Sequence, residues 1–202
     1  MSETGAVKFR CEQIPVKLDW FPGFDELNAC RRKLRELGLI GVDANEIGYG
    51  NLSVRNGATQ EFYITGSGTG YLAELTPADC AKVVWYDLIG NAVRCEGVAV
   101  ASSESLTHAA VYESDPHAAA VIHCHSAALW NRLLDLAPTT APEVEYGTPA
   151  MAFEVQRLFE RTNVKELKIF VMAGHEEGIA AFGASIEEAF DVLLRHGLAP
   201  SW

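Results

Sequence analysis

The sequence predicts an α/β fold in which short strands, many of them antiparallel, alternate with helices in layers. Two tight-turn signals, Asn56-Gly57 and Gly90-Asn91, each lie between two strand-like segments, which is typical of hairpins. Apolar residues recur every three or four positions over 25–37, as in an amphipathic helix. A regular alternation of one strand with one helix is missing from the pattern, and this disfavours an all-parallel sheet.

The individual elements are predicted in chain order from hydrophobic period, turn residues and caps. We expect strands over 51–55, 61–65, 82–86, 92–96, 119–125, 167–172 and 179–182, helices over 25–37, 103–114, 127–136, 149–161 and from 185 to about 196, and an irregular loop over 137–147. Glycines end the first helix, and its arginines, Arg31 among them, are expected mostly on the face away from the core. Thr76-Pro77 with Asp79 begins a short helical turn, and Ser185 with Glu188 forms a capping box.

Length and charge restrict the class of protein. The 202 residues fit a single domain, 1–202, in which residues 1–22 form an N-terminal arm or strand. With 16 Lys and Arg against 27 Asp and Glu, the net charge of -11 makes binding to nucleic acid unfavourable. No apolar run reaches the ~18 residues that span a bilayer, and the N-terminus lacks the features of a signal peptide. We therefore expect a cytoplasmic protein that binds neither nucleic acid nor membrane.

The five cysteines are expected to be free thiols in a reducing compartment, because the sequence has no CxxC pair and no disulfide framework. Cys30 and Cys80 are expected in the core. Cys124 lies between two histidines on a predicted strand, so its side chain should point to the opposite face from theirs and pack in the interior.

The most specific local pattern is His123-Cys-His125, on the apolar strand predicted over 119–125. Alternate residues of a strand share a face, so two imidazoles at this spacing can bind one divalent ion. Histidines with a purely structural role are the alternative. A catalytic metal site needs a third ligand, and His175, in the turn Gly174-His-Glu-Glu-Gly178, is the best candidate. A solvent-exposed loop histidine is the alternative at that position.

A second pattern, Ser102-Ser103-Glu104, comes at the start of a predicted helix. The two hydroxyls either cap this helix or form an anion site with its N–H groups, with the Glu104 carboxylate at the rim. Asn51, Thr65 and Gly66 offer further small donors at strand ends. The glycine-rich loop that follows is neither a P-loop nor a dinucleotide-binding fingerprint, because it has the spacing of neither motif.

Five segments follow one another along the chain: Gly50-Asn-Leu-Ser-Val-Arg55; Tyr63-Ile-Thr-Gly-Ser-Gly68 with Leu75-Thr-Pro77; Ser102-Ser-Glu104; Val121-Ile-His-Cys-His-Ser126; and Gly174-His175 with Gly178. In this order they resemble the class II aldolase/adducin family, which includes fuculose- and rhamnulose-phosphate aldolases, ribulose-phosphate 4-epimerase and methylthioribulose-phosphate dehydratase. Each segment alone has low specificity, whereas the ordered set has high specificity. The resemblance covers most of the chain, from about residue 25 to residue 194.

This resemblance implies a three-layer α/β/α sandwich with a mixed, largely antiparallel central sheet and a divalent metal ion on three histidines. By position in the motifs the ligands are His123, His125 and His175, and the ion is usually Zn2+, with Mn2+, Fe2+, Co2+ and Ni2+ as alternatives. Glu104 matches the family's acid/base carboxylate. The positions that cradle a substrate phosphate in the family match Asn51, Thr65, Gly66, Ser102 and Ser103.

The implied function is that of a lyase of carbohydrate metabolism, an aldolase that cleaves or forms a C–C bond in a small, commonly phosphorylated sugar through a metal-stabilised enediolate. A dehydratase or epimerase using the same metal site is an alternative, as is a non-catalytic adducin-like interaction domain. Members are commonly homotetramers with sites at subunit interfaces. The chain departs from the family pattern at Tyr49, Gly66 and Ala101 and after His175, which affects the expected substrate shape more than metal binding. The net charge of -11, with Arg55 as the one basic residue adjoining the phosphate motifs, leaves open a non-phosphorylated hydroxy-acid or keto-acid substrate.

Overall fold

The computed structural model describes residues 9–198. Its strands are β1 Arg10–Ile14, β2 Gly41–Val42, β3 Gly48–Tyr49, β4 Asn51–Arg55, β5 Phe62–Thr65, β6 Cys80–Asp87, β7 Ala92–Glu96, β8 Ala120–His125, β9 Ile169–Val171 and β10 Gly178–Gly183. Its helices are α1 Phe24–Glu36, α2 Ser105–Ser114, α3 Ala127–Leu133, α4 Pro149–Arg161, α5 Val164–Leu167 and α6 Ile186–Leu193, with short helical turns at Thr69–Tyr71, Pro77–Asp79 and Leu194–Leu198.

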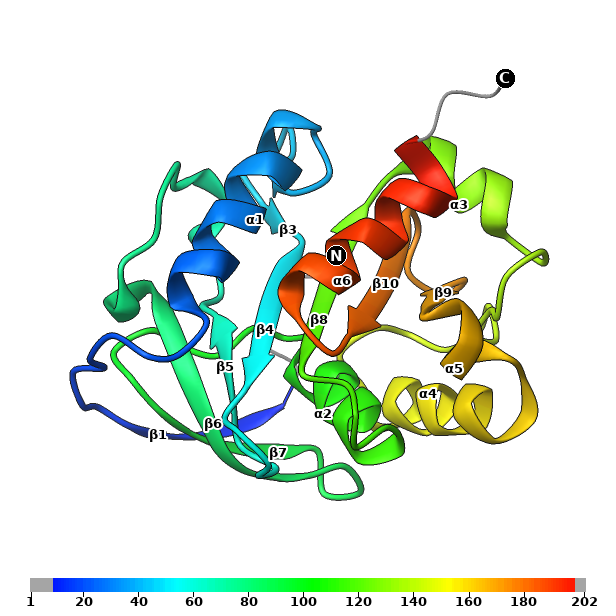
Figure 1. The fold of residues 1–202 in the computed structure, drawn as a ribbon. Helices are drawn as coiled ribbons and strands as arrows, with labels where there is room; N and C mark the ends of the chain where they lie inside the picture. The colour runs from blue at the N-terminus through cyan, green and yellow to red at the C-terminus, as the bar shows by residue number, and fades with distance from the viewer. Residues whose placement is uncertain (1–8, 199–202) are drawn as a thin grey trace.

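The main sheet contains eight strands in the order β1-β7-β6-β5-β4-β8-β10-β9. Every neighbouring pair is antiparallel except β1 with β7, so the predicted mixed, largely antiparallel sheet is confirmed. Strand β8 lies between β4 and β10, and both of its edges are therefore paired (Figure 1). A strand held on both sides is a rigid place from which to present side chains.

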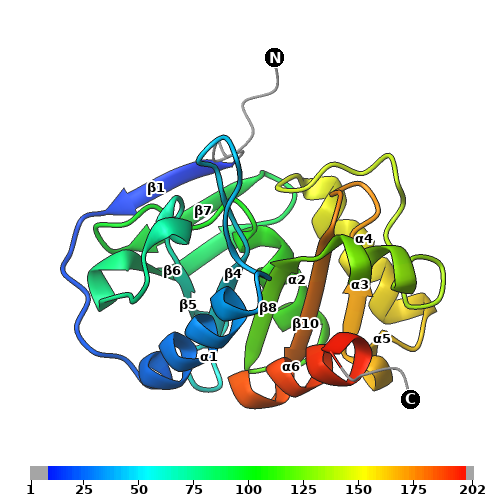
Figure 2. The same ribbon diagram turned by 90° about the horizontal axis from the view of Figure 1, so that it is seen from above.

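Helices cover both faces of this sheet, as the implied three-layer arrangement requires. Helices α1 and α6 lie side by side on one face, and α2 and α4 pack together on the other (Figures 1 and 2). Strand β8 contributes to both interfaces because its side chains alternate. Ile122 packs in the cluster that contains α1 and α6, whereas Val121 packs in the cluster that contains α2 and α4.

Local signals account for most element boundaries. The strands predicted over 51–55 and 92–96 and the helix predicted over 149–161 have the predicted bounds. Helix α4 begins at Pro149, where the Thr148 hydroxyl accepts the N–H of Met151. These boundaries are set by residues close in sequence, which is why the pattern alone could locate them.

Three expectations were wrong in detail. The helix predicted over 127–136 ends at Leu133, because Leu134 is extended and Asp135 adopts a φ of 64°. The strand predicted over 167–172 is limited to β9, because the one-turn helix α5 precedes it and is followed by Lys168, which has a left-handed φ of 56°. Arg31 does not lie on the outer face of α1, since only 2% of it is exposed.

Other expectations concern the N-terminus and the cysteines. Of the arm predicted over 1–22, residues 1–8 lie outside the described residues, and the described part contributes β1 to the sheet edge. All five cysteines are free, and Cys30, Cys80 and Cys124 are buried as predicted. Across residues 9–198, no helix combines the length and apolar character needed to cross a membrane.

Candidate metal centre and surrounding cavity

Strand β8 places the side chains of His123 and His125 on one face of the sheet and that of Cys124 on the other. His123 is paired with Asn51 of β4 and with Ala180 of β10. Cys124 packs in the hydrophobic cluster beneath α1 and α6. Burial raises the pKa of this thiol to about 12, so it stays protonated and apolar in character. The predicted division of this segment into a polar and an apolar face is therefore confirmed.

His175 reaches the same face from the turn that joins β9 to β10. Its N–H donates to the carbonyl of Met172, and its carbonyl accepts the N–H of Gly178, both within 3.0 Å. Glu177 adopts a left-handed φ of 66°, which reverses the chain. Because Gly178 is in register with His125, the turn ends directly beside the second histidine of β8.

The three imidazoles converge through their Nε2 atoms. The Nε2 of His175 lies 3.2 Å from that of His123 and 3.0 Å from that of His125. Within the described residues these histidines form a cluster whose possible ligand atoms all lie within 4.8 Å of one another. Two nitrogens bound to one tetrahedral Zn2+ at about 2.0–2.1 Å would be roughly 3.3 Å apart. The observed separations therefore fit a metal-binding cluster with little adjustment.

Hydrogen bonding and burial leave nitrogen lone pairs available in this cluster. The Nδ1 of His123 faces the carbonyl oxygen of Ile179 at 3.1 Å, so Nδ1 carries the proton and Nε2 presents its lone pair. Burial, followed by the neighbouring histidines, holds the pKa of His123 well below its usual value. Burial also lowers the pKa of His125 to about 4. Neutral imidazoles are the form that binds a metal ion.

The histidine cluster opens into a cavity of about 830 Å³. Glu104, at the N-terminal end of α2, lines this cavity and is only 2% exposed. Its Oε2 accepts a hydrogen bond of 2.8 Å from the hydroxyl of Thr107, one turn further along the helix. The structure thus brings the predicted acid/base carboxylate into the same cavity as the three predicted metal ligands.

Of the residues predicted to bind phosphate, four line this cavity and one does not. Asn51, Gly66, Ser102 and Ser103 are part of its wall. Thr65 is buried beside it, and its hydroxyl accepts the backbone N–H of Leu52 at 3.2 Å. The Thr65 hydroxyl therefore holds β5 to β4, which the sequence pattern could not distinguish from a ligand contact.

His108, on α2, belongs to a separate buried network. The Nδ1 of His108 lies 2.7 Å from the hydroxyl of Ser53, and that hydroxyl lies 2.7 Å from the hydroxyl of Tyr112. Burial lowers the pKa of His108 to about 3, so this side chain is neutral. His117, in contrast, is exposed as predicted.

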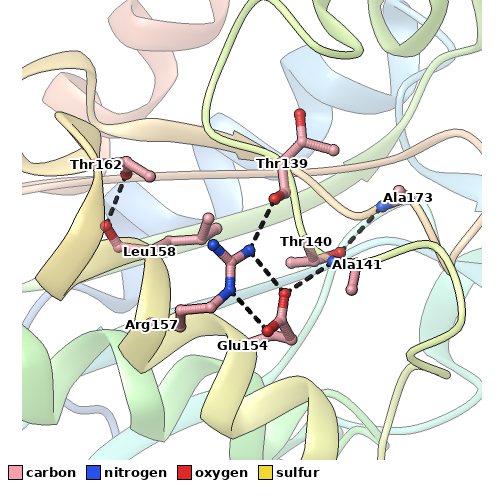
Figure 3. Close-up of polar contacts among 8 residues, drawn as sticks. All are labelled: Thr139, Thr140, Ala141, Glu154, Arg157, Leu158, Thr162 and Ala173. Carbon is pink, nitrogen blue, oxygen red and sulfur yellow. Dashed lines mark hydrogen bonds and ion pairs between the residues drawn. The ribbon is translucent and has the colours of Figure 1, made fainter.

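The irregular loop over 137–147 forms the support of the His175 turn, a role that the sequence did not reveal. The ring of Tyr146 lies against that of His175, with centroids 4.1 Å apart. The hydroxyl of Thr140 accepts the N–H of Ala173 at 3.1 Å, two residues before His175 (Figure 3). A loop of this kind has no periodic pattern from which its contacts could be predicted. The aromatic residue near its end, Tyr146, was the one feature of the sequence that pointed to a role here.

Helix α4 fixes this loop in turn. The carboxylate of Glu154 accepts the N–H of Ala141 at 2.7 Å and forms an ion pair with Arg157 (Figure 3). Arg157 also donates to the carbonyl of Thr139 at 3.1 Å. The ion pair and the Ala141 N–H lower the pKa of Glu154. The position of His175 therefore depends on contacts that extend back to α4.

Adding a methyl group at Gly174 is expected to disturb this support. A Cβ at Gly174 would lie 1.9 Å from the carbonyl oxygen of Val144, so the loop and the turn would have to separate. We expect Gly174→Ala to lower the free energy of unfolding by about 2–3 kcal/mol and to weaken metal binding. Chemical denaturation and metal titration measure these effects. The matched control is Gly48→Ala, where the nearest atom, Gly70 N, is 3.4 Å away. Equal stability of the two variants would contradict the expectation.

Comparison with known proteins identifies related sequences and folds. The profile described as Class II Aldolase and Adducin N-terminal domain matches residues 25–196. Comparison with curated proteins gives no significant sequence match. An L-fuculose 1-phosphate aldolase structure superposes with a TM-score of 0.63 and 24% identity, over 87% of this chain and 82% of the other.

Two further structures show the same fold. A putative aldolase/epimerase/decarboxylase from Klebsiella pneumoniae has a TM-score of 0.63 and 22% identity, over 86% of this chain and 84% of the other. L-fuculose 1-phosphate aldolase from Glaciozyma antarctica has a TM-score of 0.55 and 18% identity, over 92% and 80%. At these identities the similarity establishes the architecture.

Proposed function

Because the chain belongs to the class II aldolase and adducin family, we propose that it is a metal-dependent lyase that cleaves or forms a C–C bond in a small phosphorylated sugar. The observation that supports this proposal is the convergence of three histidine Nε2 atoms in the same cavity as the buried Glu104. A non-catalytic interaction domain has no need of this combination. The resemblance to fuculose-phosphate aldolases supports the sugar as the substrate class.

His123, His125 and His175 would hold the divalent ion, which we propose to be Zn2+, because a three-nitrogen donor set with an open position is typical of catalytic zinc. When bound, such an ion acts as a Lewis acid that polarises a substrate carbonyl or hydroxyl oxygen. The chain's own contribution is to fix the three imidazoles. The carbonyl of Ile179 orients His123, and the ring of Tyr146 packs against His175.

Glu104 is the residue that would move a proton. In the cleavage direction one carbon of the broken bond must gain a proton, and in the condensation direction it must lose one. Glu104 lines the cavity on the same face as the histidines, and Thr107 holds one carboxylate oxygen, which limits the carboxylate's rotation. General acid–base catalysis of this kind requires a group that is fixed close to the reacting carbon.

The phosphate of the substrate would bind to a further group of small residues in the cavity wall. Asn51 supplies an amide there, and Ser102 and Ser103 supply hydroxyls; Gly66 also lines the wall, where its N–H donates to the carbonyl of Asp79 at 2.8 Å. Neutral donors of this kind can bind phosphate through several hydrogen bonds. We propose that they orient the sugar so that its carbonyl faces the histidines and its reacting carbon faces Glu104.

The test is a screen of ketose phosphates with the metal-loaded protein. We expect release of an aldehyde, complete loss of this activity after chelation, and its return when Zn2+ is added. Borohydride in the presence of substrate should not inactivate the protein, because the proposal involves no Schiff-base lysine. Cleavage that survives complete metal removal would contradict the mechanism. Loss of water instead would indicate a dehydratase, and inversion of a hydroxyl would indicate an epimerase.

Two further properties implied by the family resemblance stay predictions. We propose a homotetramer in the cytoplasm, where the five free thiols would stay reduced. Light scattering on the protein as it elutes from gel filtration measures whether it is a tetramer.

The alternative function, an adducin-like interaction domain, would be favoured if the purified protein binds no transition metal.

A further inference from the structure

The wall of the candidate cavity has an unfavourable charge for an anionic substrate. Five acidic residues line it, and none of the described residues in the wall is a lysine or arginine: the acids are Asp43, Glu46, Glu104, Glu176 and Glu177. A phosphate group placed among these side chains would be repelled on average. A cation behind the wall, in addition to the proposed metal ion, would reduce this repulsion for an anionic substrate.

Two arginines of α1 occupy such a position. Arg31 and Arg35 are four residues apart and project from the same side of the helix. The guanidinium of Arg31 donates to the carbonyl of Thr69 at 2.7 Å and to that of Leu72 at 2.6 Å. Arg35 donates to the carbonyl of Gly70. The two cations thus bind the backbone of the glycine-rich loop at residues 66–70 and just beyond it.

The contacts with the two arginines also set the direction of N–H groups in the loop. The described peptide bonds are all trans, and in a trans peptide the C=O and the N–H of one unit point in opposite directions. The carbonyls of Thr69 and Gly70 point at the arginines, so the N–H groups of Gly70 and Tyr71 in the same peptide units point away from them. Gly68, Thr69 and Gly70 line the cavity, whereas neither arginine does.

Arg31 is the stronger of the two candidates because it is almost completely buried. Only 2% of it is exposed, and its nearest described acceptors are backbone carbonyls. Burial lowers its pKa to about 10, so it keeps its charge at neutral pH. A buried charge is weakly screened by solvent, and it polarises the peptide groups that it contacts.

We propose that Arg31 is a positioning residue that holds the 66–70 loop and supplies positive charge behind it, so that the loop binds the anionic end of a substrate. This inference rests on the proposed function only in taking the anion to be part of a substrate. Binding of an anion to the loop can be measured without any catalytic assay. Arg35 has the same role in a more exposed position.

Binding of inorganic phosphate to the Zn2+-loaded protein, followed by calorimetry, tests the proposal. Arg31→Met should weaken phosphate binding by about tenfold or more, the effect of losing one partly screened charge. Arg31→Lys keeps the charge and should restore part of the affinity. The control is Arg32→Met, whose side chain is exposed and paired with Glu74 at 2.9 Å, and it should leave the affinity unchanged. Zinc content should stay at the wild-type value in every variant. A variant that had lost its structure would also lose zinc, so this measurement separates the two causes of weaker phosphate binding.

The outcomes separate this proposal from the proposed function. If Arg31→Met fails to fold, Arg35→Met replaces it, with a smaller loss of phosphate affinity expected. Equal phosphate affinity in the folded variants and the wild type would overturn the role of Arg31. A wild-type protein that binds no phosphate but cleaves neutral ketoses would overturn it as well. Phosphate binding that depends on Arg31 in a protein that cleaves no ketose phosphate would support this inference and reject the lyase.

Discussion

Glu104→Gln is expected to lower kcat for C–C cleavage by about 10²- to 10⁴-fold, the usual contribution of a general acid–base group. Glutamine has the shape of glutamate, and its carbonyl can still accept the hydrogen bond from the hydroxyl of Thr107, so the fold and the cavity should be preserved. The amide cannot exchange a proton with substrate at neutral pH. Bound zinc should remain at the wild-type level, and kcat and zinc content are measured on the same preparation.

The matched control is Glu113→Gln, on the same helix. Glu113 is exposed at the far end of α2, where it accepts a hydrogen bond from Gln156 at 3.0 Å. This change removes the same charge without altering the cavity and should leave kcat unchanged. Full activity of a zinc-loaded Glu104→Gln protein would show that the proton is moved by another group.

His175→Ala is expected to abolish stable metal binding, and the cleavage activity with it. Two imidazoles on β8 would remain as ligands. Loss of a residue that only hydrogen-bonds to a metal ligand weakens metal binding by roughly 10–100-fold, and loss of a ligand itself should weaken Zn2+ binding by more than this. Zinc per chain after gel filtration, and the shift in thermal midpoint on adding Zn2+, both report this loss. Ligands that bind only the folded state raise the midpoint, so the wild type should shift and the variant should not.

His117→Ala provides the control, because His117 is exposed at the turn that precedes β8. Its zinc content should match that of the wild type. The apo forms of both variants should unfold at similar temperatures, because His175 lies in a partly exposed turn. A His175→Ala protein that retains a full equivalent of zinc and its activity would remove this residue from the proposed ligand set.

The sequence located the part of the site that depends on local pattern. Alternation on a strand placed His123 and His125 on one face and Cys124 on the other, and the structure agrees. The glycines around His175 predicted a turn between two strands, and β9 and β10 flank it. In both cases the geometry is set by the backbone period of a few neighbouring residues.

Contacts between distant segments could not be predicted in this way. Arg31 looks like a surface residue of an amphipathic helix, yet it is buried against a distant loop, where it donates to the carbonyl of Leu72, 41 residues further along the chain. Tyr146 lies in a loop without periodicity, and only the folded chain brings it to His175. The hydroxyl of Thr65 accepts the N–H of Leu52 from the neighbouring strand, a contact that the sequence pattern could not show, and its own O–H is left as a donor, so its role as a phosphate ligand stays a prediction.

The pairing of β10 with β8 also determines when the three proposed metal ligands first come together. His123 and His175 are 52 positions apart, and they meet only after β10 has been synthesised and has added to the sheet beside β8. A nascent chain that has left the ribosome only as far as α4 therefore presents two of the three proposed ligands, His123 and His125. The complete set of three proposed ligands therefore exists only once β10 has paired with β8.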